Sequence, residues 1–110
     1  SQLRKLLEQN SFNRNVQDLI YDEAMGISPL TEILKKLQMS ERALQRKLES
    51  EGTNFRELVE KVRCEKAIQL LKNPNLSLEN IADHLGYSNT KNFSRAFKRW
   101  TSTTPRRYDT

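Results

Sequence analysis

The feature that most constrains the fold of this chain is an internal repeat. Residues 33–40 align with residues 81–88 at an offset of 48, with apolar residues and a serine at matching positions. One residue is then inserted, and residues 44–48 align with residues 93–97, with an arginine two residues after the first apolar position in each. In a repeat of this kind each copy forms one supersecondary unit. The sequence therefore predicts two copies of one unit.

Each copy has the pattern of a helix, a tight turn and a second helix. A helix-turn-helix needs a small residue where its helices cross and a turn residue that tolerates positive φ. Ala82 and Gly86 meet both needs in the second copy, whereas the first copy has Leu34 and Gln38. A left-handed residue other than glycine costs about 1 kcal/mol, which a turn can tolerate. We therefore predict two helix-turn-helix units, of which the second matches better.

A longer helix is predicted between the two copies. Asn54 and Glu57 have the spacing of a capping box, with asparagine as its first member. The helix that they open is predicted to end near Lys72, before an Asn-Pro pair. Its apolar residues lie on one face as far as Val62 and on the opposite face from Cys64 onward. Two apolar stripes indicate a linker helix that contacts two small cores.

The residues before the first copy are also predicted to be helical. Leucines indicate a short helix around residues 3–7, and apolar spacing indicates a second helix from Asn13 to Ala24, which Gly26 ends. Ser28 and Pro29 then have the pattern of an N-cap followed by proline at the first helical position. We expect a lead-in made of helices.

The predicted fold is all-α, with about seven helices. No strand-like alternation of useful length occurs, and Thr104-Pro105 is expected to open a last turn that ends near Tyr108. The predicted organisation is a helical lead-in, a first helix-turn-helix, a linker helix, and a second helix-turn-helix with a C-terminal turn, over residues 1–27, 28–52, 53–73 and 74–110.

Charge and composition restrict the possible functions. The chain has 19 Lys and Arg against 14 Asp and Glu, and residues 86–108 hold six basic residues and no acidic one. A local basic patch indicates a polyanionic partner, although an ordinary solvated face is the alternative. Apolar stretches are too short for a membrane span or a signal segment. One cysteine and one histidine cannot form the usual metal site, so we expect no cofactor or metal.

Five motifs carry a resemblance to a known family: Met39–Leu48, Glu51–Phe55, Ile81–Ser88, Phe93–Trp100 and Thr104–Tyr108. They resemble the DNA-binding domain of AraC-type (AraC/XylS) bacterial transcription regulators, over residues 28–108. The chain departs from the family pattern at Leu34 and Gln38, and at Ser102, where the family usually has glycine. The resemblance implies two helix-turn-helix subdomains on a long helix, and a role in transcription regulation.

The resemblance also implies which side chains contact base edges. Arginine can form two hydrogen bonds with guanine and glutamine two with adenine. In each copy the second helix has two inward apolar residues, and the side chains away from them are available to DNA. The implied base contacts are Arg42, Gln45 and Arg46, and some of Thr90, Lys91, Asn92, Ser94 and Arg95.

Phosphate contacts are expected where helix N-termini or basic side chains face the DNA backbone. A 19-residue linker helix would measure about 28 Å, which is close to the spacing of about 34 Å between successive major grooves. We therefore expect the two second helices to enter adjacent major grooves. The expected phosphate contacts are Ser28, Ser40, Ser77, Lys98, Arg99, Arg106 and Arg107.

Other functions are weaker interpretations of the same residues. A helical protein-interaction adaptor with a basic face is the main alternative, but it gives no reason to duplicate the arginine. RNA binding lacks the usual aromatic platform, and no arrangement typical of an enzyme occurs. The expected partner is operator DNA in a bacterial cytoplasm, at the nucleoid, with RNA polymerase as a second candidate and no membrane. The family's effector-sensing or dimerisation region is expected to lie outside this chain.

Overall fold

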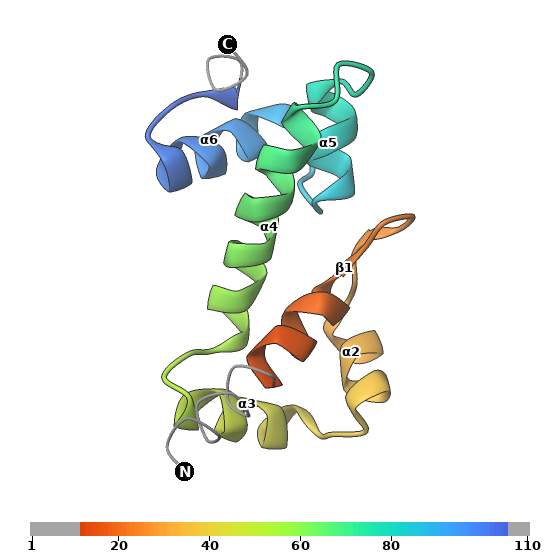
Figure 1. Ribbon diagram of the computed structural model, residues 1–110, viewed down its shortest axis with the longest axis vertical. Coiled ribbons are helices and arrows are strands. Elements are labelled where there is room, and N and C mark those ends of the chain that lie inside the picture. The colour runs from red at the N-terminus through yellow and green to blue at the C-terminus, as the bar shows by residue number, and fades with distance from the viewer. Residues whose placement is uncertain (1–11, 106–110) are drawn as a thin grey trace. The chain divides into compact units, whose positions relative to one another are not determined.

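The computed structural model describes residues 12–105 and divides the chain into two compact units, one ending at Val62 and one beginning at Arg63. Within residues 12–105 there are six helices and one pair of two-residue strands (Figure 1). The all-α prediction is confirmed, and the helix expected near residues 3–7 lies outside the described residues. The elements are a helix over residues 12–20, β1 (Tyr21–Asp22), β2 (Gly26–Ile27), α2 (Leu30–Leu37), α3 (Glu41–Ser50), α4 (Phe55–Leu71), α5 (Leu78–His84) and α6 (Thr90–Thr101).

The lead-in differs from its prediction, because its helix ends at residue 20 and a hairpin follows. β1 pairs with β2 in antiparallel register, with Tyr21 opposite Ile27. The Asp22 carboxylate accepts hydrogen bonds from the N–H groups of Ala24 and Met25, both at 2.8 Å. An aspartate that binds backbone groups close to it in the chain favours a turn over a helix. The expected helix to Ala24, and the absence of strands, were therefore wrong for this segment.

The start of α2 also differs from its prediction. The N-cap residue is Pro29, whose carbonyl accepts from the N–H groups of Glu32 and Ile33. Ser28 is one residue too early to cap the helix, and its N–H donates to the carbonyl of Ile20 at 2.8 Å. This bond closes the base of the hairpin, so Ser28 belongs to the hairpin rather than to α2.

The core of the first unit is aliphatic. Helix 12–20 contributes Val16 and Ile20, α2 contributes Ile33, and α3 contributes Leu44 and Leu48, all of them buried. Each such side chain stabilises the fold by about 1.5–3 kcal/mol on burial. Because Leu44 and Leu48 are four residues apart, their burial directs the opposite face of α3 toward solvent.

The core of the second unit contains an aromatic cluster beside buried aliphatic side chains such as Ile81 and Leu85. Phe93 and Phe97 on α6 are fully buried, with ring centroids 5.9 Å apart. Tyr87 and Trp100 extend this cluster, with Tyr87 5.8 Å from Phe93 and Trp100 6.4 Å from Phe97. Tilted and edge-to-face pairs of this kind add to the stabilisation from burial. The cluster fixes the orientation of α6 about its own axis.

Helix α4 contributes to both cores, as its two apolar stripes predicted. Leu58 and Val62 are buried in the first unit, whereas Ala67 and Leu71 are buried in the second. Asn54 begins the helix, since its side-chain oxygen accepts from the Glu57 N–H at 2.9 Å. The Glu57 carboxylate in turn accepts from the Thr53 hydroxyl at 3.0 Å, a variant of the expected capping box.

Candidate nucleic-acid interface

The two helix-turn-helix modules have the same pattern of hydrogen bonds in their turns. We call α2, its turn and α3 the first module, and α5, its turn and α6 the second. In the first, the N–H of Gln38 donates to Lys35 at 3.2 Å and that of Met39 to Leu34 at 3.2 Å. In the second, Gly86 donates to Asp83 at 3.1 Å and Tyr87 to Ala82 at 2.9 Å. This pair of bonds is a Schellman motif, which closes a helix through a left-handed residue.

The left-handed residue is Gln38 in the first turn and Gly86 in the second, with φ of 55° and 89°. The turn predicted at Gln38 despite its side chain is therefore confirmed. Ser102, the third departure from the family pattern, is also left-handed, with φ of 64°. The departures at Gln38 and Ser102 are thus accommodated in left-handed positions without loss of the fold.

Each second helix has a side-chain cap. Ser40 accepts from the N–H of Ala43 at 3.1 Å at the start of α3. At the start of α6 the cap is Asn89, which accepts from the N–H of Asn92 at 2.8 Å. Sequence comparison missed Asn89, because the repeat aligns Ser40 with Ser88. The inserted residue displaces the cap by one position, and the capping spacing from Asn89 to Asn92 was the available signal.

The outer face of α3 carries a stripe of four exposed side chains, opposite Leu44 and Leu48. Three were predicted to contact bases, and the fourth, Glu49, was missed although helical spacing places it on the same face. None of the four forms a hydrogen bond or ion pair with another residue between 12 and 105. We call this set the α3 stripe: Arg42, Gln45, Arg46 and Glu49.

The equivalent face of α6 is more basic than the α3 stripe, but more of its side chains are half-buried or hydrogen-bonded. Lys91, Arg95 and Lys98 are exposed, whereas Ser94 is half-buried. We call these four residues the α6 stripe. Beside it, Thr90 is half-buried, and the exposed Asn92 donates its side-chain N–H to the Ser88 hydroxyl at 3.1 Å. The structure thus places all eight predicted base contacts on or beside the two stripes.

The predicted phosphate contacts are placed less uniformly. Ser40 and Ser77 are exposed helix caps, and Ser77 accepts from the N–H of Asn80 at 3.1 Å. Lys98, the last residue of the α6 stripe, and Arg99 are exposed near the end of α6. Ser28 is half-buried and caps no helix. Arg106 and Arg107 lie outside the described residues.

Arg63 joins the second half of α4 to the turn that precedes α6. Its Nε–H donates to the carbonyl of Leu85 at 2.9 Å, and its guanidinium lies 5.0 Å from the centre of the Tyr87 ring. The bond satisfies a carbonyl at the end of α5, and the ring contact is a cation–π interaction. Arg63 therefore holds the turn between α5 and α6 in place.

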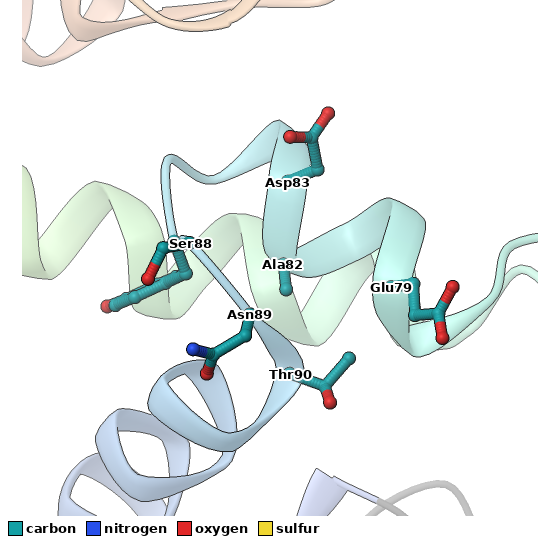
Figure 2. Close-up of a pocket in the computed structure, with 7 residues that line it drawn as sticks. Glu79, Ala82, Asp83, Ser88, Asn89 and Thr90 are labelled. Carbon is teal, nitrogen blue, oxygen red and sulfur yellow. The ribbon is translucent and has the colours of Figure 1, made fainter.

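A hollow of about 320 Å³ lies between α5 and the start of α6. Figure 2 shows Glu79 and Asp83 on α5, with Asn89 and Thr90 across the hollow on the segment that begins α6. Its two carboxylates would repel a phosphate, so the hollow is unsuited to the DNA backbone. No group of three or more His, Cys, Asp or Glu residues in the described part of the chain could hold a metal ion.

Comparisons with a protein family and with curated proteins bear on these modules. The family described as a helix-turn-helix domain matches residues 33–110. An uncharacterized HTH-type transcriptional regulator of Mycobacterium tuberculosis is 35% identical over 107 residues, which cover 94% of this chain and 31% of that protein. The HTH-type transcriptional regulator VqsM of Pseudomonas aeruginosa is 48% identical over 67 residues, covering 61% of this chain and 21% of that protein.

A solved structure shares the fold. The crystal structure of the transcriptional regulator CdpR from Pseudomonas aeruginosa superposes with a TM-score of 0.78 at 34% identity, over 89% of this chain and 31% of that one. The chain therefore spans a third or less of the length of these three proteins. Among residues 12–105, no helix is long and apolar enough to cross a membrane.

Proposed function

Since the chain belongs to the AraC-type helix-turn-helix family of transcription regulators, we propose that it recognises a specific operator in double-stranded DNA, with α3 and α6 as its recognition helices. The observation that carries this proposal is the α3 stripe. Its three nitrogen-bearing side chains are exposed and have no partner among residues 12–105, and Leu44 and Leu48 fix them on the side away from the core. Side chains of this kind read base edges in the major groove.

We assign the proposed contacts with bases and with phosphates to different residues of the exposed surface. Base edges would be contacted by Arg42, Gln45 and Arg46 in the first module, and by some of Thr90, Lys91, Asn92, Ser94 and Arg95 in the second. The DNA backbone would be contacted by the N-termini of α3 and α5, at Ser40 and Ser77, and by Lys98 and Arg99. Arg106 and Arg107 would extend the same basic surface.

We further propose that the two recognition helices bind adjacent major grooves. Support comes from α4, whose 17 residues measure about 26 Å in a continuous helix, and from the burial of its two halves in two different cores. Successive major grooves on one face of DNA are about 34 Å apart. We propose in the same way that the full protein senses an effector or dimerises, that it is located at the nucleoid, and that it contacts RNA polymerase.

The salt dependence of binding to duplex DNA tests the electrostatic part. Each neutralised phosphate releases counterions, so about six contacts should give a log–log slope near −5. A slope near zero on random duplex DNA would contradict this account. An acidic protein as competitor separates operator binding from the adaptor alternative, since only an adaptor would prefer the protein to the DNA.

Two arginine variants test the specific part. Arg46→Ala and Arg95→Ala should each weaken binding to the selected site by about 1–3 kcal/mol and relax base preference in one half-site. The relaxed positions should lie about 10 base pairs apart. Lys98→Ala, as a matched loss of one charge, should weaken all sequences alike. Relaxation of the same base pairs by both arginine variants would exclude two adjacent grooves.

A further inference from the structure

We infer that the half-site under α3 contains two G·C pairs and one A·T pair within three consecutive base pairs, and that the first module carries more of the operator's sequence information than the second. This inference rests on the proposed function, because it assumes that α3 lies in a major groove. It goes further by naming the class of DNA sequence that the α3 stripe selects.

The first step is the chemistry of the α3 stripe. Arg42 and Arg46 each present a planar guanidinium, which can bind guanine O6 and N7 together. Gln45 presents a planar amide, which can bind adenine N6 and N7 in the same way. All three side chains are exposed and have no partner among the described residues. No intramolecular bond to a described residue therefore has to be broken before they read a base.

The second step is their spacing. Arg42 and Arg46 are four residues apart, or about 6 Å along the helix axis. Two base-pair steps measure about 7 Å at 3.4 Å each. Gln45 lies between the two arginines along the chain and on the same face. The three side chains therefore span three adjacent base pairs, of which the arginines select two and the glutamine one.

The third step is the contrast with the α6 stripe. Lys91 and Lys98 end in ammonium groups, which lack the planar fork of arginine. Ser94 is half-buried, and the Asn92 amide is held by Ser88 at 3.1 Å. Arg95 is thus the single exposed side chain of this face, within the described residues, that has a planar and uncommitted head. The second module is equipped to read fewer bases.

Selection of bound duplexes from a random pool tests this inference. The wild-type chain should enrich a site in which one cluster of three pairs holds two G·C and one A·T. Arg46→Gln should change one of these G·C pairs to A·T, because an amide replaces the guanidinium. The preference at that pair should shift by about 5- to 150-fold.

Lys47→Gln is the matched control, since it removes one charge and introduces the same side chain outside the stripe. Lys47 lies 4.3 Å from the centre of the Phe12 ring. The control should leave the selected sequence unchanged. Circular dichroism of both variants checks that exposed substitutions leave the fold intact.

The outcomes separate this inference from the proposed function. A specific site whose α3-dependent pairs have another composition would overturn the inference and leave the proposed function standing. The same holds if Arg95→Ala removes more sequence information than Arg42→Ala, Gln45→Ala and Arg46→Ala together. Failure to enrich any sequence, with equal binding to all duplexes, would overturn the proposed function itself.

Discussion

The first and second modules have the same backbone turn but different surfaces toward DNA. Their Schellman bonds fall at equivalent residues, although glutamine occupies the left-handed position in one and glycine in the other. Helix α3 carries three basic and two acidic residues, whereas α6 carries four basic residues and no acidic one. The comparison shows that the turn depends on its hydrogen bonds more than on glycine. The surface could therefore diverge while the fold was kept.

The strongest contrast expected between the modules is in their cores. Leu48 and Phe97 occupy equivalent positions and are both fully buried. Leu48→Ala should lower the free energy of unfolding by about 2–5 kcal/mol and Phe97→Ala by about 3–5 kcal/mol. Phe97 should be the more costly, because its loss also breaks ring contacts with Phe93 and Trp100. Urea unfolding measures both, and a smaller loss at Phe97 would contradict the importance given to the aromatic cluster.

Exchange of the two turn residues should change the free energy of unfolding by about 1 kcal/mol, in opposite directions at the two positions. Gln38→Gly should stabilise the chain, since it removes a side chain from a left-handed position. Gly86→Gln should destabilise it by a similar amount, because it introduces that side chain at φ of 89°. Both positions are exposed, so packing changes little. Thermal unfolding of the two variants measures the effect, and equal shifts in one direction would disprove the equivalence of the turns.

A charge exchange at the ends of the two stripes should alter affinity without altering sequence preference. Glu49 stands in the first module where Lys98 stands in the second. Glu49→Lys should add about one phosphate contact, tighten binding to all duplexes, and steepen the log–log salt slope by about 0.9. Lys98→Glu should have the opposite effect. A change of base preference on Glu49→Gln, with the salt slope preserved, would instead make Glu49 a reader of bases.

The smallest effect concerns Glu51, just after α3. Burial raises the pKa of this carboxyl, against a smaller opposing effect of Lys47, and its oxygens have no hydrogen-bond partner in the described structure. A raised pKa in the folded state favours the protonated form, so stability is lost as the pH rises from the ordinary pKa of 4.5 through the raised pKa. Glu51→Gln should stabilise the chain at pH 7. The gain should shrink toward pH 4.5, and a gain independent of pH would show that ionisation is not its cause.

Much of the fold could be predicted because it depends on patterns that extend over many residues. The repeat located both modules, and the two stripes of α4 located its two cores. The hairpin at Tyr21–Ile27 could not be predicted in this way, because apolar spacing continues to Ala24 while one carboxylate, Asp22, forms the turn. Asn89 was missed for a related reason, since a single insertion displaced the cap from the serine that the repeat suggested.

The candidate site was predictable in part. Exposure of the arginines followed from the buried leucines and phenylalanines on the other side of each helix. Whether an exposed side chain is already hydrogen-bonded within the chain could not be predicted from the sequence, because it depends on local bonds such as that between Asn92 and Ser88. Which base each side chain meets stays a prediction, since it also depends on how the helix lies in the groove.

The bond from Asn92 to Ser88 has a consequence for how such a regulator could evolve. Ser88 lies before α6, outside the set of residues proposed to touch DNA. Its replacement by alanine would release an exposed amide of the type that pairs with adenine. One substitution at a residue that is not itself proposed to contact bases could thus change which bases the second module recognises. A lineage could acquire new target promoters in this way while every residue of its recognition helices stayed the same.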